Sequence, residues 1–284
     1  MKTQLSVLLL LGLPLSQSSA QVQYTGEEYR DYYDWFHQYS QTPDFYLDGT
    51  TLITFQDNVP LRTAPSVDSK TQVNLPIGKA VTNIYVPVED AVFSMQNGYL
   101  DQWFHVETCS ANRNVVEGYV WGGHLAKSWN YFQAPGDKEP SLLALGLSDE
   151  NRQQPEDIKA SLKIIRNGEQ AQALTLKGIC LFEQCAASSL LRVFDLSEKA
   201  PQWIFEASIF STGCLTGVDK ALISWDGNEM HLVHQAEYTT GHTYTSNPFY
   251  IRNSEQTQIC YYQNENEAYE PVWACRTLDT VVAP

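Results

Sequence analysis

Apolar and polar residues alternate with a period of two in short runs over much of the C-terminal half, a pattern typical of β-strands. Two pairs of runs flank turn dipeptides: 162–165 and 170–176 around Asn167-Gly168, and 221–225 and 230–233 around Asp226-Gly227. These dipeptides are strong hairpin signals, because their residues accept the positive φ angles of a tight turn. The pattern therefore predicts two antiparallel hairpins.

Further strands are predicted by the same alternation at residues 190–194, 203–210, 249–252, 259–262 and 272–276. Helical periodicity in this half is confined to residues 157–161. Many short strands separated by turn residues favour a sandwich or a small irregular barrel. We therefore expect a β-rich domain of unassigned family over residues 141–284.

Residues 21–50 are rich in aromatic side chains. Thr25 and Glu28 have the spacing of a capping box, and large rings recur at helical intervals at Tyr29, Tyr32, Tyr33 and Phe36. This spacing predicts a short amphipathic helix that packs its rings on the next domain. An aromatic platform that stacks on sugars is the functional alternative.

Four motifs follow one another between residues 58 and 126. They are Val59-Pro60-Leu61-Arg62-Thr63-Ala64-Pro65-Ser66, Leu75-Pro76-Ile77-Gly78, Trp103-Phe104-His105-Val106 and Gly118-Tyr119-Val120-Trp121-Gly122-Gly123-His124-Leu125. In order and spacing they resemble the bacterial SH3-like domain (SH3b), whose usual motifs are N-V-R-x-x-P-S, L-x-x-G, W-x-x-V and G-Y-V-x-x-x-x-L. The resemblance implies a small all-β barrel over residues 51–133 that serves as a binding module and not as a catalyst.

Two insertions depart from the SH3b pattern. Residues 87–101 replace what is usually a very short turn, and residues 109–116 lengthen the next hairpin loop. Insertions of this kind are tolerated on the surface loops of a small barrel. We therefore expect both on the surface.

Strand alternation divides the W-x-x-V motif between two faces. Phe104 and Val106, together with Val120, are expected to fill the barrel. The residues left for a binding rim or groove, where aromatic rings supply contact area and a polar edge, are Arg62, Trp103, Tyr119 and Trp121. An exposed Trp103 beside the insertion 87–101 is the expected anchor of this groove. Packing between the two domains is the competing role for Tyr119 and Trp121.

A cluster of turn formers and charges, with Pro135-Gly136-Asp137 and Pro140, predicts a linker at residues 134–140. It would divide the barrel from the C-terminal domain.

Residues 1–20 have the pattern of a secretory signal peptide. Lys2 is followed by an apolar run at residues 5–13 and by Ser18-Ser19-Ala20 as a cleavage site. The run is shorter than the ~20 apolar residues that a membrane helix needs, and no later stretch approaches that length. We therefore expect an exported protein, periplasmic or secreted, without a membrane span.

The chain is acidic, with 18 Lys and Arg against 33 Asp and Glu and a formal net charge of −15. Binding to phosphate backbones or to anionic lipid relies on Lys and Arg. The charge therefore argues against nucleic acid as a partner.

Six cysteines in an exported chain favour disulfides over metal ligands. Cys260 and Cys275 would face each other in a hairpin that is symmetric about its centre. Cys180 and Cys185 are close enough in sequence for a tight loop disulfide. By elimination Cys109 would pair with Cys214. His231 and His234 would point to opposite faces of a strand unless a bulge intervenes, so no metal site is expected.

Ser211-Thr212-Gly213-Cys214 resembles the S-x-G-C motif of L,D-transpeptidases, whose Cys is the nucleophile. That chemistry needs a base to stabilise the thiolate, and the family's His lies shortly upstream. No His occurs here between His124 and His231, and Leu215 follows Cys214 in place of the family's Arg. A catalytic Cys214 is therefore the alternative and not the main interpretation.

The expected function is non-catalytic binding in the bacterial cell envelope, to peptidoglycan or to an envelope protein, with no cofactor. Two alternatives stay open. One is a cell-wall-modifying cysteine enzyme that uses Cys214. The other is a structural subunit whose SH3b module packs on its own C-terminal domain, which a groove covered by residues 141–284 would favour.

Overall fold

The computed structural model describes the following residues: 23–25, 48–87, 90–97, 99–109, 113–133, 138–148, 159–176, 188–195, 203–211, 217–239, 249–253, 257–263 and 272–277. These residues form β-strands, one 3-10 turn and connecting loops, and no α-helix is found among them. The all-β prediction is therefore confirmed. Most of the predicted N-terminal helix lies outside the described residues, and Thr25, its expected cap, ends a strand.

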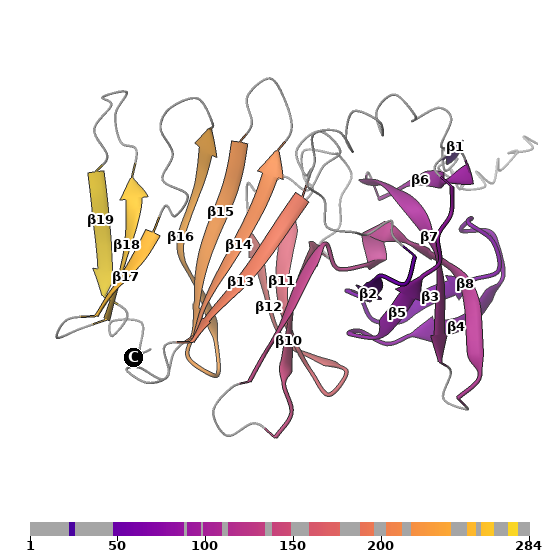
Figure 1. Ribbon diagram of the computed structural model, residues 1–284, viewed down its shortest axis with the longest axis horizontal. Coiled ribbons are helices and arrows are strands. Elements are labelled where there is room, and N and C mark those ends of the chain that lie inside the picture. The colour runs from indigo at the N-terminus through magenta and orange to yellow at the C-terminus, as the bar shows by residue number, and fades with distance from the viewer. Residues whose placement is uncertain are drawn as a thin grey trace, which may run out of the picture.

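The first eight strands form one antiparallel sheet, which we call the N-terminal unit (Figure 1). They are β1 (Gln23–Thr25), β2 (Thr51–Ile53), β3 (Val59–Arg62), β4 (Thr71–Leu75), β5 (Ala80–Asn83), β6 (Val92–Gln96), β7 (Tyr99–Cys109) and β8 (Val115–Trp121). The order is β1-β6-β7-β8-β3-β4, with β5 pairing both β2 and β7. The strands enclose a buried cluster that contains Phe104, Val106 and Val120, which confirms these three as core residues.

The second sheet has the order β12-β11-β10-β9. Its strands are β9 (Ser128–Phe132), β10 (Ser141–Leu147), β11 (Ala160–Arg166) and β12 (Glu169–Leu176). Every residue of β10 is buried, because both faces of this sheet are covered. Leu143 and Leu145 point into one cluster, and Leu142 and Ala144 into another. A strand buried on both sides needs an almost continuous apolar run, and β10 reads Ser-Leu-Leu-Ala-Leu-Gly-Leu.

The predicted linker 134–140 connects β9 to β10, which pair with each other in one sheet. The strand before the linker therefore belongs to the sheet after it. The division of the chain into domains otherwise stays a prediction.

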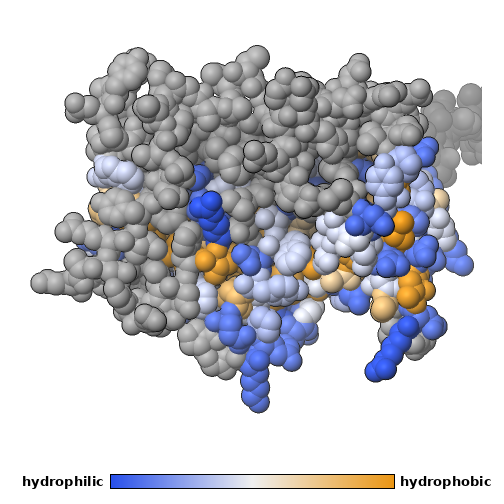
Figure 2. Space-filling model, viewed as in Figure 1, coloured by the Kyte–Doolittle hydropathy of each residue, from blue (hydrophilic) through white to orange (hydrophobic). Residues whose placement is uncertain are grey.

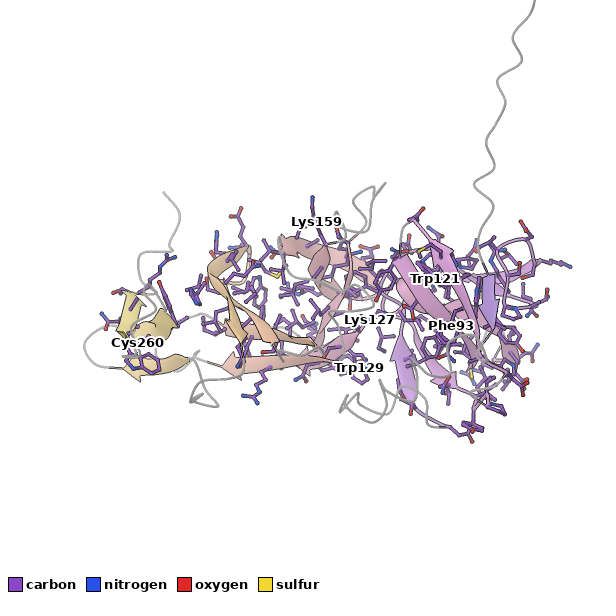
Figure 3. All side chains as sticks on the ribbon, turned by 90° about the horizontal axis from the view of Figure 1, so that it is seen from above. Phe93, Trp121, Lys127, Trp129, Lys159 and Cys260 are labelled. Carbon is purple, nitrogen blue, oxygen red and sulfur yellow. A yellow bond between two sulfur atoms is a disulfide. The ribbon has the colours of Figure 1, made fainter. Side chains whose placement is uncertain are left out.

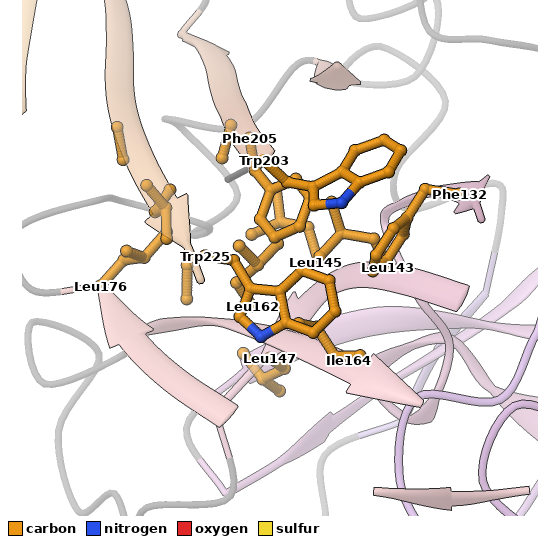
Figure 4. Packing of buried hydrophobic residues seen from close by; sticks show 14 of the residues in the cluster. Phe132, Leu143, Leu145, Leu147, Leu162, Ile164, Leu176, Trp203, Phe205 and Trp225 are labelled. Atoms are coloured by element: carbon orange, nitrogen blue, oxygen red, sulfur yellow. The ribbon is translucent and has the colours of Figure 1, made fainter. Parts of the chain in front are cut away.

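The third sheet has the order β13-β14-β15-β16 and packs face to face on the second. Its strands are β13 (Ser188–Asp195), β14 (Trp203–Ser211), β15 (Gly217–Trp225) and β16 (Met230–Thr239). Rings of Trp203, Phe205 and Trp225 lie against Phe132 and the leucines of the second sheet (Figure 4). The two sheets thus form a sandwich.

The fourth sheet, β17-β18-β19, covers the outer face of the third. Its strands are β17 (Phe249–Asn253), β18 (Thr257–Gln263) and β19 (Val272–Thr277). The chain is therefore a row of four layers, from the N-terminal unit on the right of Figure 1 to β17–β19 on the left. No helix among the described residues is long and apolar enough to cross a membrane.

Both hairpins predicted from turn dipeptides are confirmed. Asn167 and Gly168, with φ of 54° and 76°, join β11 to β12, and Gly227, with φ of 102°, lies in the turn from β15 to β16. In the turn at Asn167 and Gly168, positive φ at both central residues matches the right-handed twist of the flanking strands.

The predicted disulfide between Cys260 and Cys275 is confirmed. The two residues lie directly opposite each other on β18 and β19, as Tyr262 and Trp273 do, and a bond joins the two sulfurs. Cys109 is a free and exposed thiol, so the predicted pair with Cys214 is wrong. The pairing by elimination failed because it assumed that every cysteine is bonded. Cys180, Cys185 and Cys214 lie outside the described residues.

Replacing Cys275 with Ser is expected to lower the free energy of unfolding by about 2 to 4 kcal/mol. The bridge closes a loop with a sequence separation of 15, and its loss gives the unfolded chain more conformational freedom. Thermal denaturation of both proteins without reductant measures the change. Equal melting temperatures would show that the bridge does not stabilise the fold.

Candidate functional site

Trp103, the expected exposed anchor, is buried. Only 3% of its surface is accessible, and its indole Nε1–H donates to Ser94 Oγ at 2.8 Å. Trp121, which pairs with it on β8, is 2% accessible and donates from Nε1 to the carbonyl oxygen of Ser94 at 3.1 Å. The prediction of an exposed Trp103 is therefore wrong.

The insertion 87–101 covers the two tryptophans. It forms β6, which folds back on β7 and places the buried Ser94 against both indole nitrogens. The ring of Tyr99, at the start of β7, meets Trp121 edge to face with centroids 6.1 Å apart. The insertion was expected to be a surface loop, although its residues 92–96 read Val-Phe-Ser-Met-Gln, with a strand former at the start.

Trp103 and Trp121 belong to the same buried cluster as the sandwich core of sheets two and three. Figure 3 shows Trp121 in the N-terminal unit, with Lys127 and Trp129 beside the junction to the second sheet. Trp103 and Trp121, two of the four residues predicted to form the binding rim, are therefore internal packing residues.

The other half stays partly accessible. Tyr119 of β8 stacks on His105 of β7, with ring centroids 4.8 Å apart and an angle of 19° between the planes. Arg62 of β3 is paired with Tyr119, and its Nη1 donates to the carbonyl oxygen of Ser69 at 2.6 Å. We call Arg62, His105 and Tyr119 the outer platform.

The outer platform consists of two aromatic rings stacked on each other and of Arg62, which lies opposite Tyr119 on the neighbouring strand. His105 Nε2 lies 3.9 Å from Glu117 Oε2, so a carboxylate also borders it. Aromatic faces next to charged and polar edges suit the amphipathic faces of sugars and peptides. On the face of the molecule shown in Figure 2, hydrophobic residues are scattered among hydrophilic ones over the described part.

Contacts between the N-terminal unit and the second sheet are close. Phe55 is fully buried, and a Cβ atom on Gly146 of β10 would lie 2.6 Å from its ring. Lys163 of β11 donates from Nζ to the carbonyl oxygen of Phe55 at 3.2 Å and lies 4.4 Å from the ring centroid. Gly78 approaches Ile165 in the same way. The condition for the structural alternative was a groove covered by residues 141–284. It is met at Trp103 and Trp121, which share a buried cluster with these residues.

A charged pair fixes the same junction. Lys127, which precedes β9, forms an ion pair with Asp101 of β7 and donates to the carbonyl oxygen of Gly122 at 3.2 Å. Its backbone N–H donates to Leu145 of β10. The connection between unit and sandwich is therefore held by main-chain and side-chain bonds together.

Comparison of the chain with family models, with curated proteins and with solved structures finds no match.

A buried charge cluster on the third sheet was missed in the sequence. Glu206 of β14 is 2% accessible, and its Oε1 accepts from Lys220 Nζ at 2.9 Å and from Ser208 Oγ at 3.0 Å. Arg192 Nη1 lies 3.8 Å from Oε2. Glu206 stands within the mostly apolar segment Trp-Ile-Phe-Glu-Ala-Ser, which could have indicated a buried acid. The cluster was not predicted because an acidic residue in a strand is ordinarily exposed.

A register shift between β15 and β16 places His234 opposite Leu222 and His231 opposite Ser224, two positions apart, so the prediction that the two histidines point to opposite faces is wrong. His231 Nε2 lies 3.8 Å from Glu229 Oε2, whereas His234 stacks on Tyr261 of the fourth sheet. Among the described residues no group of three or more His, Cys, Asp or Glu side chains could hold a metal ion.

Proposed function

We propose that this protein is a non-catalytic binding protein of the bacterial cell envelope, exported to the periplasm or secreted, whose N-terminal unit is an SH3b-like module. The module would bind peptidoglycan or an envelope protein through the outer platform. The observation that carries the proposal is the accessible stack of His105 on Tyr119 beside Arg62.

The proposed binding face differs from the one that the sequence favoured. Arg62 and Tyr119 are kept, while Trp103 and Trp121 are assigned to internal packing because both are almost fully buried. His105 replaces them as the second ring. The structural alternative is thereby combined with the binding one. Trp103 and Trp121 lie in the cluster shared with the C-terminal layers and Tyr119 packs against its edge, while Arg62, His105 and Tyr119 stay partly accessible.

The enzyme alternative rests on Cys214, which lies outside the described residues. Only the sequence bears on this alternative, and it argues against catalysis, because the missing upstream His leaves the Cys214 thiol without a base. We therefore propose no catalysis.

Replacing Tyr119 with Ala is expected to weaken binding to purified peptidoglycan sacculi by about 30-fold, because truncating an aromatic anchor costs about 2 kcal/mol of binding energy. His105→Ala should weaken it as well, since it removes the stacked neighbour. Co-sedimentation of the mature protein with sacculi measures the affinity, and thermal melts confirm that the variants are folded.

Tyr131→Ala is the matched control, because Tyr131 is 50% accessible and lies on β9, away from the platform. Its affinity should equal that of the unmodified protein. Unchanged binding in Tyr119→Ala would exclude the platform. If the unmodified protein binds neither sacculi nor an envelope protein, the purely structural alternative takes the lead.

A further inference from the structure

The fourth sheet packs on the outer face of the third through apolar side chains. Among the residues that the structure describes, its buried contacts are Ile204, Leu222, Val233, Ile259 and Tyr261, with Ala274 packed beside them. These contacts stabilise the docked layer, because hydrophobic stabilisation grows with the apolar area removed from water. Its own disulfide joins β18 to β19 independently of that contact.

A histidine lies in this interface. The ring of His234, on β16, stacks on the ring of Tyr261, on β18, with centroids 3.9 Å apart and 19° between the planes. Arg276 of β19 lies beside them: its Nη1 donates to the carbonyl oxygen of Val233 at 2.8 Å, and its guanidinium is 5.7 Å from the Tyr261 centroid. A fixed positive charge of the fourth sheet is thus held next to the residue that precedes His234.

The charged and titratable groups described around this interface are Arg192 on β13, Glu206 on β14, Lys220 on β15, His231 on β16, Glu229 in the turn before it, Tyr261 on β18 and Arg276 on β19. Each of the two carboxylates among them has a basic side chain of its own as a neighbour. Glu206 is held by Lys220 and Arg192, and Glu229 lies beside His231. The charge described nearest to His234 is that of Arg276.

We propose that the β17–β19 layer is a pH-sensitive element, docked on the sandwich at neutral pH and loosened when His234 takes up a proton. A protonated imidazole would lie in the interface beside Arg276, and separation of the layers would return both charges to water. The disulfide would keep β18 and β19 together after separation.

The direction in which docking changes with pH follows from the linkage between proton binding and docking. Burial, and secondly the charge of Arg276, lower the pKa of His234 from its ordinary value of 6.5. In the undocked state His234 keeps its ordinary pKa, so this state binds the proton more tightly than the docked one. Docking is at full strength above the ordinary pKa and is lost as the pH falls through the lowered one.

Hydrogen exchange followed by mass spectrometry tests the proposal on the full mature chain at pH 7.5 and pH 5.0, with rates corrected for the intrinsic effect of pH. We expect protection of β17–β19 to fall in acid by about tenfold for each unit by which the pKa is lowered. Protection of β10 and β11 should not change. His234→Phe keeps a stacking ring without a titrating group and should make protection of β17–β19 independent of pH.

His234→Gln serves as a second neutral variant if the Phe variant does not fold, and Arg276→Gln should reduce the acid response without abolishing it. Three results would overturn the proposal. They are equal protection of the unmodified protein at both pH values, the same acid response in both His234 variants, and simultaneous loss of protection in all four layers, which would indicate global acid unfolding.

Discussion

Replacing Trp103 with Ala is expected to lower the free energy of unfolding by about 3 to 5 kcal/mol. The side chain is 3% accessible and packs in the cluster that continues into the sandwich core. Its removal leaves a cavity between β6 and β7 and takes away the indole donor of Ser94 Oγ, itself buried. An exposed groove residue would give a change within about 0.5 kcal/mol.

Two variants calibrate this experiment. Phe104→Ala removes a residue from the core of the N-terminal unit and should cost a similar amount, whereas Tyr131→Ala removes a half-accessible ring and should cost little. Urea denaturation at 25 °C gives all three values. If Trp103→Ala behaves like Tyr131→Ala and loses sacculus binding per folded molecule, Trp103 is a binding residue after all and the outer platform is not the site.

Lys220→Met is expected to cost about 3 to 5 kcal/mol, because removing one partner of a buried ion pair leaves the other uncompensated. Glu206 would keep the Ser208 hydroxyl and the more distant Arg192, while remaining 2% accessible. The lost bond is the shortest of the three, at 2.9 Å from Nζ to Oε1. Denaturation at neutral pH measures the change.

The double variant Glu206→Met with Lys220→Met separates the ion pair from simple packing. Replacement of both partners by apolar side chains of similar volume is often neutral. The double variant should therefore be clearly more stable than the sum of the two single changes predicts. Strict additivity would mean that the two side chains do not interact, and that Glu206 is tolerated for another reason.

Local features were predictable from sequence because neighbouring residues alone determine them. Asn167 and Gly168 accept positive φ in a tight turn whatever surrounds them, so the dipeptide alone locates the hairpin. Cys260 faces Cys275 because the hairpin register follows from chain symmetry. Strand alternation placed Phe104 on the opposite face from Trp103, and this division is correct.

What lies against each face was decided only by the tertiary structure. Alternation assigns Trp103 and Trp121 to the side away from the Phe104 core, but it does not say whether water or protein covers that side. Strand β6 covers part of it, because Ser94 and its neighbours pair with β7. The sandwich covers another part, because Trp103 and Trp121 share a buried cluster with residues far away in the sequence. The outer platform remained partly accessible as the uncovered part of the same face.

Ion pairs and layer contacts also depend on long-range geometry. Glu206 and Lys220 meet because β14 pairs with β15 in one register, and His234 meets Tyr261 because the fourth sheet packs on the third. Each contact requires loop closure between distant residues, and no local pattern encodes its partner. The sequence alone therefore determined many of the strands, two hairpin turns and the disulfide register. The structure added strands such as β6 and decided which faces are buried between layers, because burial depends on what the rest of the chain places there.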